Sequence, residues 1–325
     1  MAATLETARL VAIVGPTASG KSDLAMAAAS RMAGEIVSCD SVQVYRGLDI
    51  GSGKPSTLDR TRVPHHLVDI LDPNEEMNAA VFARRAAEAI AEISDRGRLP
   101  IVTGGTGLYL TALLKGLFED RGADALVRKR LDGLAERFGA TRLHRLLSAK
   151  DSAYGAKTKP SDRVRIVRAL EVCFVTGKPF SLIQMERKPV FRGRALLIGL
   201  HPSRDELRGR VVARTRRMLS AGLVAETKHI LSSSSPGRPR GLGAIGYREV
   251  VTRLAHGSLD FGGDDELQRA IVKSTMQYAK RQMTYFRNQF DVAWFAESEA
   301  ALTHIQDWVR KGPGSPKWVE KGSAR

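Results

Sequence analysis

Eight consecutive residues near the start of the chain have the types and the spacing that bind phosphate. The run Gly15-Pro16-Thr17-Ala18-Ser19-Gly20-Lys21-Ser22 has four residues between its two glycines, followed by lysine and serine, as phosphate-binding loops do. In such loops the backbone N–H groups and the N-terminus of the next helix face phosphate oxygens. We expect Lys21 to reach the terminal phosphate and the Ser22 hydroxyl to bind Mg²⁺. Residues 15–22 therefore predict a site for a diphosphate or polyphosphate.

The elements that must hold this loop can be read from the residues around it. Residues 10–14 are a short apolar run typical of a buried strand, and residues 24–32 are alanine-rich and favour a helix. Residues 35–39 and 100–103 predict further strands, while residues 78–96 and those from Leu108 onward predict helices. This alternation predicts the α/β class with a parallel sheet, built as a phosphate-loop (nucleoside-triphosphate-hydrolase-like) core. Ligands then bind at the carboxyl ends of the strands.

Two polar residues are predicted at that edge of the sheet. Asp40 ends the strand at 35–39, which we expect next to the strand of the phosphate loop, and Thr106 follows the strand at 100–103. A carboxylate at Asp40 can act as a general base toward an acceptor above the phosphates. The alternative for Asp40 is a turn or helix-capping residue. No predicted strand ends in four apolar residues and an aspartate, which argues against a nucleotide-driven motor but leaves a small-molecule kinase open.

The middle of the chain differs from both ends. Strand signals vanish over residues 121–191 and short helical periods replace them, whereas the apolar run at 195–200 predicts that the sheet resumes. Long helices are predicted at 204–221 and 264–288, with a loop at 232–241. We therefore predict a core domain from residues 1–120 and 192–311, a helical insertion domain at 121–191, and a flexible tail at 312–325.

Basic residues are in excess and are arranged on helix faces. The chain has 325 residues with 51 lysines and arginines against 35 aspartates and glutamates, a formal net charge of +16, which predicts attraction for polyanions, with nucleic acid as the first candidate. Arg210, Arg214 and Arg217 recur at helical spacing, and an anion in front of them relieves their mutual repulsion; the alternative is a solvated face. The last long helix has a polar stripe suited to a phosphate backbone, namely Lys273, Gln277, Lys280, Thr284 and Arg287.

The composition of the chain indicates the cellular compartment in which we expect the protein. The only cysteines are Cys39 and Cys173, which argues against a disulfide framework and fits a reducing compartment. We see neither a secretory signal nor an apolar run long enough to cross a bilayer. We expect a cytoplasmic protein that does not bind membranes, and nothing in the sequence indicates an obligate oligomer, so we expect a monomer.

At this point the residues match a known family: the chain resembles the tRNA dimethylallyltransferases. The resemblance is carried, in order along the chain, by GPTASGKS (15–22), SCDSVQVYRGLDIGSGKP (38–55), HHLVDI (65–70), GGTGLYL (104–110), RVRIVRALEV (163–172), MLSAGLVAE (218–226), AIGYRE (244–249) and YAKRQMTYFR (278–287). It implies transfer of a dimethylallyl group from its diphosphate to the exocyclic amine of the adenine adjacent to the anticodon. The chain lacks the Cys/His ligands of relatives with a C-terminal zinc finger, which points to the shorter, bacterial type.

The resemblance also implies roles for single residues. Asp40 matches the aspartate that accepts the amine proton, Arg214 the arginine that steadies the leaving pyrophosphate, and Thr106 a catalytic threonine, while residues 15–22 hold the diphosphate with Mg²⁺ at Ser22. The residues that match tRNA-contacting segments are Asp40, Ser41, Val42, Gln43, Val164, Arg165, Arg168, Ala244, Gly246, Tyr247, Arg248, Lys280, Arg281, Gln282 and Arg287. An adenylate isopentenyltransferase and a phosphate-loop kinase remain as alternatives, but both leave the basic stripe without a purpose.

Overall fold

A computed structural model describes residues 8–117, 124–233, 239–255 and 263–312. The chain divides into two compact units: one contains the described residues within Met1–Leu114 and Val190–Arg325, and the other those within Lys115–Pro189. The predicted tail lies almost wholly outside the described residues. So does the centre of the predicted loop at 232–241, whose first two residues still belong to a helix.

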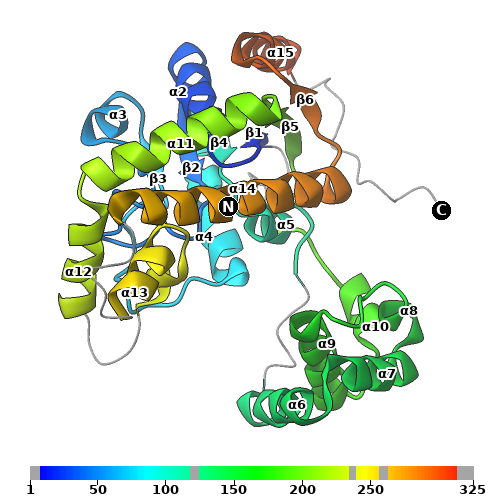
Figure 1. Cartoon of the computed structure of the whole chain (residues 1–325). Helices are drawn as coiled ribbons and strands as arrows, with labels where there is room; N and C mark the ends of the chain where they lie inside the picture. The colour runs from blue at the N-terminus through cyan, green and yellow to red at the C-terminus, as the bar shows by residue number, and fades with distance from the viewer. Residues whose placement is uncertain (1–7, 118–123, 234–238, 256–262, 313–325) are drawn as a thin grey trace. The chain divides into compact units, whose positions relative to one another are not determined.

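The first unit is built on a parallel sheet, as predicted, and this sheet has six strands (Figure 1). Its strands are β1 (Arg9–Val14), β2 (Gly34–Ser38), β3 (His65–His66), β4 (Leu99–Thr103), β5 (Arg194–Leu200) and β6 (Ala293–Phe295). They lie in the order β3-β2-β4-β1-β5-β6, and every pair is parallel. The central strands read as continuous apolar runs because helices cover both of their faces. The short edge strands β3 and β6 escaped prediction, since two or three residues carry no periodic signal.

One predicted neighbour relation is wrong. Strand β2, which leads to Asp40, does not lie beside β1; β4 lies between them, with Ile101 in register with both Val11 and Ile36. The ends of β1, β2 and β4 still lie together at one edge of the sheet, because Gly104 lets them approach closely. A Cβ at Gly104 would lie 2.0 Å from the Cys39 carbonyl oxygen, so no other residue fits there without moving the backbone that precedes Asp40.

Helices surround this sheet on both sides. Buried side chains of α2 (Lys21–Arg31) and α15 (Ser298–Arg310) join those of β1, β2, β4 and β5 in one core. Helix α4 (Ala79–Asp95) packs on β2 and β4 and on α5 (Gly107–Leu114), and α5 also contacts α14 (Gly263–Gln289). Figure 1 places α2 and α15 above the sheet and α5 below it. The remaining elements of this unit are α3 (Thr57–Arg62), α11 (Arg204–Ser220), α12 (Leu223–Ser233), the 3₁₀ helix η1 (Arg240–Gly243) and α13 (Tyr247–Ala255).

In its described residues the second unit is entirely helical, as the sequence predicts. It contains α6 (Ala125–Phe138), α7 (Ala140–Lys150), α8 (Ser152–Gly155), α9 (Arg163–Thr176) and α10 (Phe180–Met185) around its own apolar core. A fully buried carboxylate, Glu171 on α9, accepts hydrogen bonds from Arg128 and Arg168 and from the Asp124 backbone N–H. These partners compensate the cost of burying its charge.

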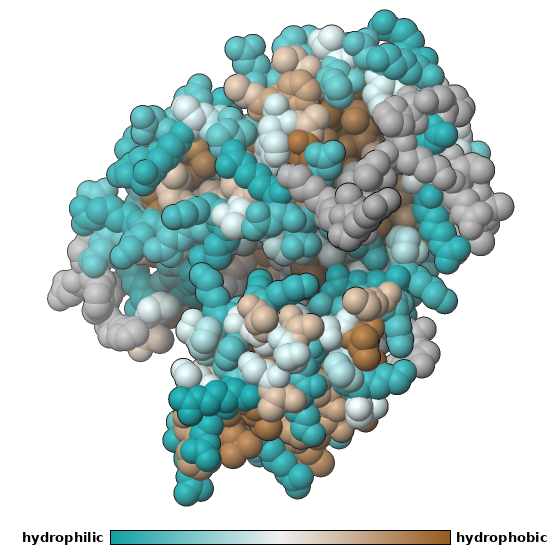
Figure 2. Space-filling model, turned by 90° about the vertical axis from the view of Figure 1, so that its right-hand side faces the viewer, coloured by the Kyte–Doolittle hydropathy of each residue, from teal (hydrophilic) through white to brown (hydrophobic). Residues whose placement is uncertain are grey.

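The surface in Figure 2 is mostly hydrophilic, as the many charged residues of the chain lead one to expect. On the face shown in Figure 2, hydrophilic residues predominate and apolar residues form smaller groups. Among the described residues, no helix combines the length and the apolar character that a membrane crossing needs. Both cysteines are buried and free.

Candidate active site

The phosphate loop has the predicted surroundings. Strand β1 ends at Val14 and α2 begins at Lys21, directly after Gly20, whose φ of 92° belongs to the left-handed region that glycine favours. Thr17, Ala18, Gly20, Lys21 and Ser22 line a cavity of about 850 Å³, which we call the donor cavity. The Lys21 ammonium donates to the Pro16 carbonyl at 3.1 Å.

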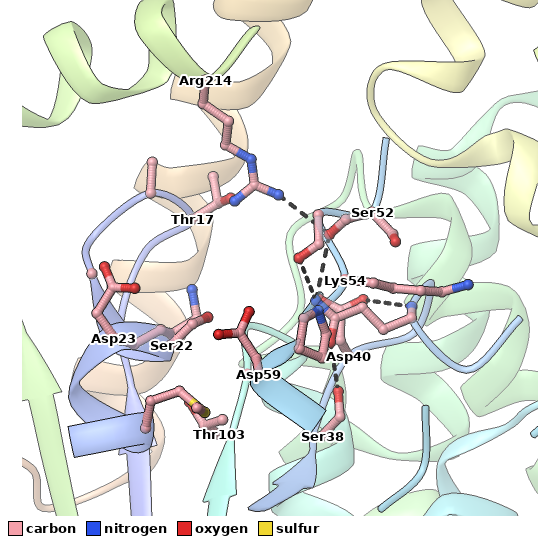
Figure 3. Close-up of a pocket in the computed structure, with 18 of the residues that line it drawn as sticks. Thr17, Ser22, Asp23, Ser38, Asp40, Ser52, Lys54, Asp59, Thr103 and Arg214 are labelled. Atoms are coloured by element: carbon pink, nitrogen blue, oxygen red, sulfur yellow. Dashed lines mark hydrogen bonds between the residues drawn. The ribbon is translucent and has the colours of Figure 1, made fainter. Parts of the chain in front are cut away.

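The arginine face of α11 turns toward this cavity. Arg210, Arg214 and Arg217 all line it. Arg210 donates to the Ser19 carbonyl at 3.1 Å, and Arg214 donates to the Ser52 carbonyl at 3.2 Å. Figure 3 shows Arg214 reaching toward Ser52 with Thr17 close to its guanidinium. Arg214 is half-buried, and Arg210 and Arg217 are exposed at the edge of the cavity. Because all three border one cavity, the arrangement favours the anion-binding interpretation over a purely solvated face.

The cavity concentrates positive charge away from water. Burial lowers the pKa of Lys21 to about 8; nearby Arg214 acts in the same direction, and Asp40 opposes it. Burial also lowers the pKa of Arg214, with Asp40 opposing and Arg217 adding to the shift. Burial destabilises the charged forms of these two side chains until an anion is present. The donor cavity is thus suited to a small polyanion such as a diphosphate.

Asp40 is placed so that both of the roles considered for it are available. Its Oδ1 accepts hydrogen bonds from the backbone N–H groups of Val42 at 2.8 Å and Gln43 at 3.3 Å, which makes it a turn residue. Among the described residues nothing donates a hydrogen bond to its Oδ2. One oxygen therefore fixes the carboxylate while the other can accept a proton from a ligand.

Thr106 supports the turn that follows Asp40. Its hydroxyl oxygen accepts a hydrogen bond from the Ser41 N–H at 3.1 Å, and its own N–H donates to the Cys39 carbonyl at 3.2 Å. These contacts fix the residues on both sides of Asp40. The geometry favours a positioning role for Thr106; its predicted catalytic role remains a prediction.

A second cavity of about 320 Å³ opens beside the first, and we call it the acceptor cavity. Five residues line both cavities: Thr17, Asp40, Ser52, Arg214 and Met218. The acceptor cavity has apolar walls with polar groups among them, from Ser41, Val42, Ala244, Ile245, Arg248, Ile271, Tyr278 and Arg281. A flat aromatic ring with polar edges suits such walls. The shared residues place the carboxylate of Asp40 where the two cavities meet.

Residues predicted to contact nucleic acid fall into two groups. On the first unit, the residues of the α14 stripe, which include Lys280 and Arg287, are exposed, and so are Arg248 and Arg281. On the second unit Val164 and Arg165 are exposed, and Arg168 pairs with Glu171.

Three of these residues, Gly246, Tyr247 and Gln282, are buried, and the side chains of the last two are placed otherwise than a nucleic-acid contact requires. Tyr247 is 0% and Gln282 5% exposed, and both side chains make hydrogen bonds inside the protein. Each lies in a matching segment, but on the inward face of its helix or turn. A motif match does not separate the two faces of a helix, which is why both residues were assigned to the surface.

One functional carboxylate was missed. Glu226 on α12 accepts hydrogen bonds from the backbone N–H groups of Asp49, Ile50 and Gly51. It thereby holds the loop that brings the Ser52 carbonyl to Arg214. Its place in the segment MLSAGLVAE was the only signal, since a lone glutamate on a helix is ordinarily a surface residue.

The structure offers a limited set of metal ligands. Among the residues that the structure describes, no group of three or more histidine, cysteine or acidic side chains is arranged to hold a metal. Ser22 and Asp23 both line the donor cavity beside Lys21. This set fits Mg²⁺, which commonly takes one or two protein ligands and completes its shell with phosphate oxygens and water.

Comparison with known proteins identifies the family. The model of the IPP transferase family matches residues 43–289, and that of the isopentenyl transferases matches residues 8–67. The chain belongs to the IPP transferase family. A tRNA dimethylallyltransferase of Geobacter metallireducens is 47% identical over 290 residues, covering 89% of this chain and 93% of the relative. The corresponding protein of Halorhodospira halophila is 45% identical over 310 residues, covering 93% and 97%.

Solved structures of this IPP transferase family share the fold. The tRNA isopentenylpyrophosphate transferase of Bacillus halodurans is 35% identical with a TM-score of 0.67, covering 94% of this chain and 96% of that one. A eukaryotic dimethylallyltransferase acting on tRNA is 26% identical with a TM-score of 0.77, covering 96% and 81%. The phosphate-loop core predicted from the sequence is therefore confirmed.

Proposed function

We propose that this IPP transferase transfers a dimethylallyl group from dimethylallyl diphosphate to the exocyclic amine of the adenine adjacent to the anticodon in tRNA, releasing pyrophosphate. The observation that carries the proposal is the meeting of the two cavities at Asp40, Thr17 and Arg214. One cavity suits a diphosphate and the other an aromatic ring, and a carboxylate lies at their junction. The relatives named above have this activity in their names.

The leaving group must drive the reaction, because an aromatic amine is a weak nucleophile. As the amine nitrogen bonds to C1 of the dimethylallyl group, the C1–O bond breaks and its electron pair leaves with pyrophosphate. Lys21 and Arg214 stabilise the charge that grows there, and the N–H groups of the phosphate loop assist them. Charge fixed in place before the reaction stabilises the transition state without reorganising solvent.

Asp40 accepts the proton that the amine loses. As the C–N bond forms, the amine becomes acidic, and Oδ2 of Asp40 is the oxygen that can accept its proton. The two backbone N–H groups on Oδ1 fix the carboxylate in position, which orients the amine as well. The adenine must leave its stack to enter the acceptor cavity, at low cost in a single-stranded anticodon loop. Donor and base then enter from opposite ends.

The exposed stripe of α14 holds the RNA. Lysine and arginine contacts to phosphate position a nucleic acid without reading its bases, and Arg248 and Arg281 extend the basic surface to the acceptor cavity. On the second unit we propose Val164, Arg165 and Arg168 as further contacts. Free adenosine monophosphate would leave this surface unused, which favours tRNA over a nucleotide as acceptor.

Three further properties belong to the proposal. Ser22 would hold a Mg²⁺ ion, which when bound neutralises charge on the diphosphate. The protein would act as a monomer, since residues of one chain line both cavities and Asp40 lies where the cavities meet. It would work in the cytoplasm, where two free, buried cysteines stay reduced.

One assay tests the proposal. Purified protein, Mg²⁺ and labelled dimethylallyl diphosphate are incubated with either an adenine-containing anticodon stem-loop or adenosine monophosphate. We expect label on the stem-loop alone. Label on the mononucleotide would make the chain an adenylate isopentenyltransferase, and label on neither would refute prenyl transfer and revive a phosphate-loop kinase.

A further inference from the structure

Two of the segments of the first unit that we propose to contact RNA each send one buried side chain toward a wall of the donor cavity. The segments are residues 244–248 and 280–287, and the side chains are Tyr247 and Gln282. Both point away from the surface that their neighbours Arg248 and Lys280 expose. Because neither side chain is exposed, their hydrogen bonds indicate a task inside the protein.

Gln282 connects α14 with the phosphate loop. Its Oε1 accepts the Thr17 N–H at 2.9 Å, and its Nε2 donates to the Gly105 carbonyl at 2.9 Å. A Cβ on Gly105 would lie 2.1 Å from that Nε2, so glycine is required for the amide to reach both loops. A single side chain thus joins the RNA-facing helix to the first wall of the donor cavity.

Tyr247 connects the other segment with the second wall. Its hydroxyl donates to Glu226 at 2.6 Å and accepts the Gly51 N–H at 3.0 Å. Glu226 in turn holds the N–H groups of Asp49 and Ile50. Ser52, which follows Gly51 in the chain, presents the carbonyl that accepts the hydrogen bond from Arg214. This chain of contacts runs from the RNA-facing turn to the arginine of the donor cavity.

We propose that Tyr247 and Gln282 are positioning residues that couple RNA binding to the donor cavity, an inference that rests on the proposed function. Hydrogen bonds weaken steeply with distance and angle, so small shifts of α14 or of residues 244–248 change how Thr17 and Ser52 are held. RNA that fixes these segments fixes both walls of the cavity. A coupling of this kind is reciprocal: each ligand changes the affinity of the other by the same factor.

The test measures that factor directly. An anticodon stem-loop with purine in place of the target adenine lacks the exocyclic amine and cannot react. The dissociation constant of dimethylallyl diphosphate with Mg²⁺ is measured by calorimetry with and without this RNA. We expect the wild-type ratio of the two constants to be about fivefold or more, as for other coupled sites.

Two variants remove the connections, and two further variants serve as controls. Gln282→Met keeps the length of the side chain without its polar atoms, and Tyr247→Phe removes only the hydroxyl. Gln268→Met makes the same change on the same helix, and Tyr109→Phe removes a buried hydroxyl that donates to the Met77 carbonyl at 3.0 Å. A merely structural role would affect Tyr109→Phe as much as Tyr247→Phe.

We expect the ratio to fall toward one in Gln282→Met and Tyr247→Phe, with RNA affinity in the absence of donor unchanged. The two control variants should keep the wild-type ratio. A wild-type ratio of one, or variants that keep the wild-type ratio, would overturn the coupling while transfer to the adenine-containing stem-loop still supports the proposed function. If the wild type neither binds nor modifies that stem-loop, both proposals fail.

Discussion

Helices α11 and α14 carry similar rows of cations, yet the protein uses them in opposite ways. Arg210, Arg214 and Arg217 of α11 line the donor cavity, where burial lowers the pKa of the half-buried Arg214, while Arg210 and Arg217 lie exposed at its edge. Lys280 and Arg287 of α14 lie exposed. The two helices pack against each other, and their apolar contact includes Leu207, Val211 and Ala279. Enclosure suits a small anion whose charge must be stabilised strongly, and exposure suits an extended polyanion that is held at many weak points.

The difference has a physical basis in screening. Charges on the surface are weakened by water and salt, whereas charges in a cavity are screened much less. A substitution at Arg214 of α11 should therefore cost much and respond little to salt. A substitution on α14 should cost little and change the salt dependence.

The largest effect is expected at Asp40, which lines both cavities. Asp40→Asn keeps an oxygen for the N–H groups of Val42 and Gln43 but cannot accept a proton, so kcat should fall about 10³-fold. Asp40→Ala, which removes the carboxylate entirely, should abolish transfer. Binding of the stem-loop should persist in both variants, as a filter-binding assay would show. Loss of RNA binding instead would remove Asp40 as the base.

Arg214→Ala should have the next largest effect. Removing a charge that stabilises the leaving group costs about 10²-fold in kcat/KM, and the loss should be the same at low and high salt. Arg216→Ala is the matched control, because Arg216 is exposed on the same helix. Equal losses in the two variants would contradict the inward assignment of the Arg214 face.

The donor cavity should also respond to pH. With a pKa of about 8, Lys21 in the free protein loses its proton as pH rises above that value, and the cavity loses one positive charge. The dissociation constant of dimethylallyl diphosphate should then rise about tenfold for each further pH unit, the slope expected for one coupled proton. Titrations across this range check it. Lys21→Met should bind weakly with no such slope; a slope that survives in Lys21→Met would assign the titration to another group.

The smallest effect is expected on the exposed helix. Lys280→Ala should weaken stem-loop binding modestly and reduce the slope of log K against log salt by about one, because one phosphate contact is lost. Arg84→Ala removes a charge from the exposed surface of α4 and should leave the slope unchanged. An unaltered slope in Lys280→Ala would take that residue out of the RNA footprint.

Local patterns predicted much of the fold and of the donor site. Strands β1, β4 and β5 and helices α2, α4, α11 and α14 follow from apolar runs and helical periods that lie close to one another in sequence. Helix α15 and the edge strands β3 and β6 were missed. Short strands carry little local signal, and they form because the neighbouring strand offers free hydrogen-bonding groups.

By itself the sequence determined the chemistry that is available: a phosphate loop with Lys21 and Ser22, the carboxylate of Asp40 after a strand, and two cationic helices. Only the tertiary structure decided where these groups face. It placed β4 between β1 and β2, turned Arg214 of α11 into the donor cavity, and directed Tyr247 and Gln282 away from the surface. Helical spacing fixes which residues share a face, but the partner that covers that face comes from distant parts of the chain. That choice depends on the packing of the whole core.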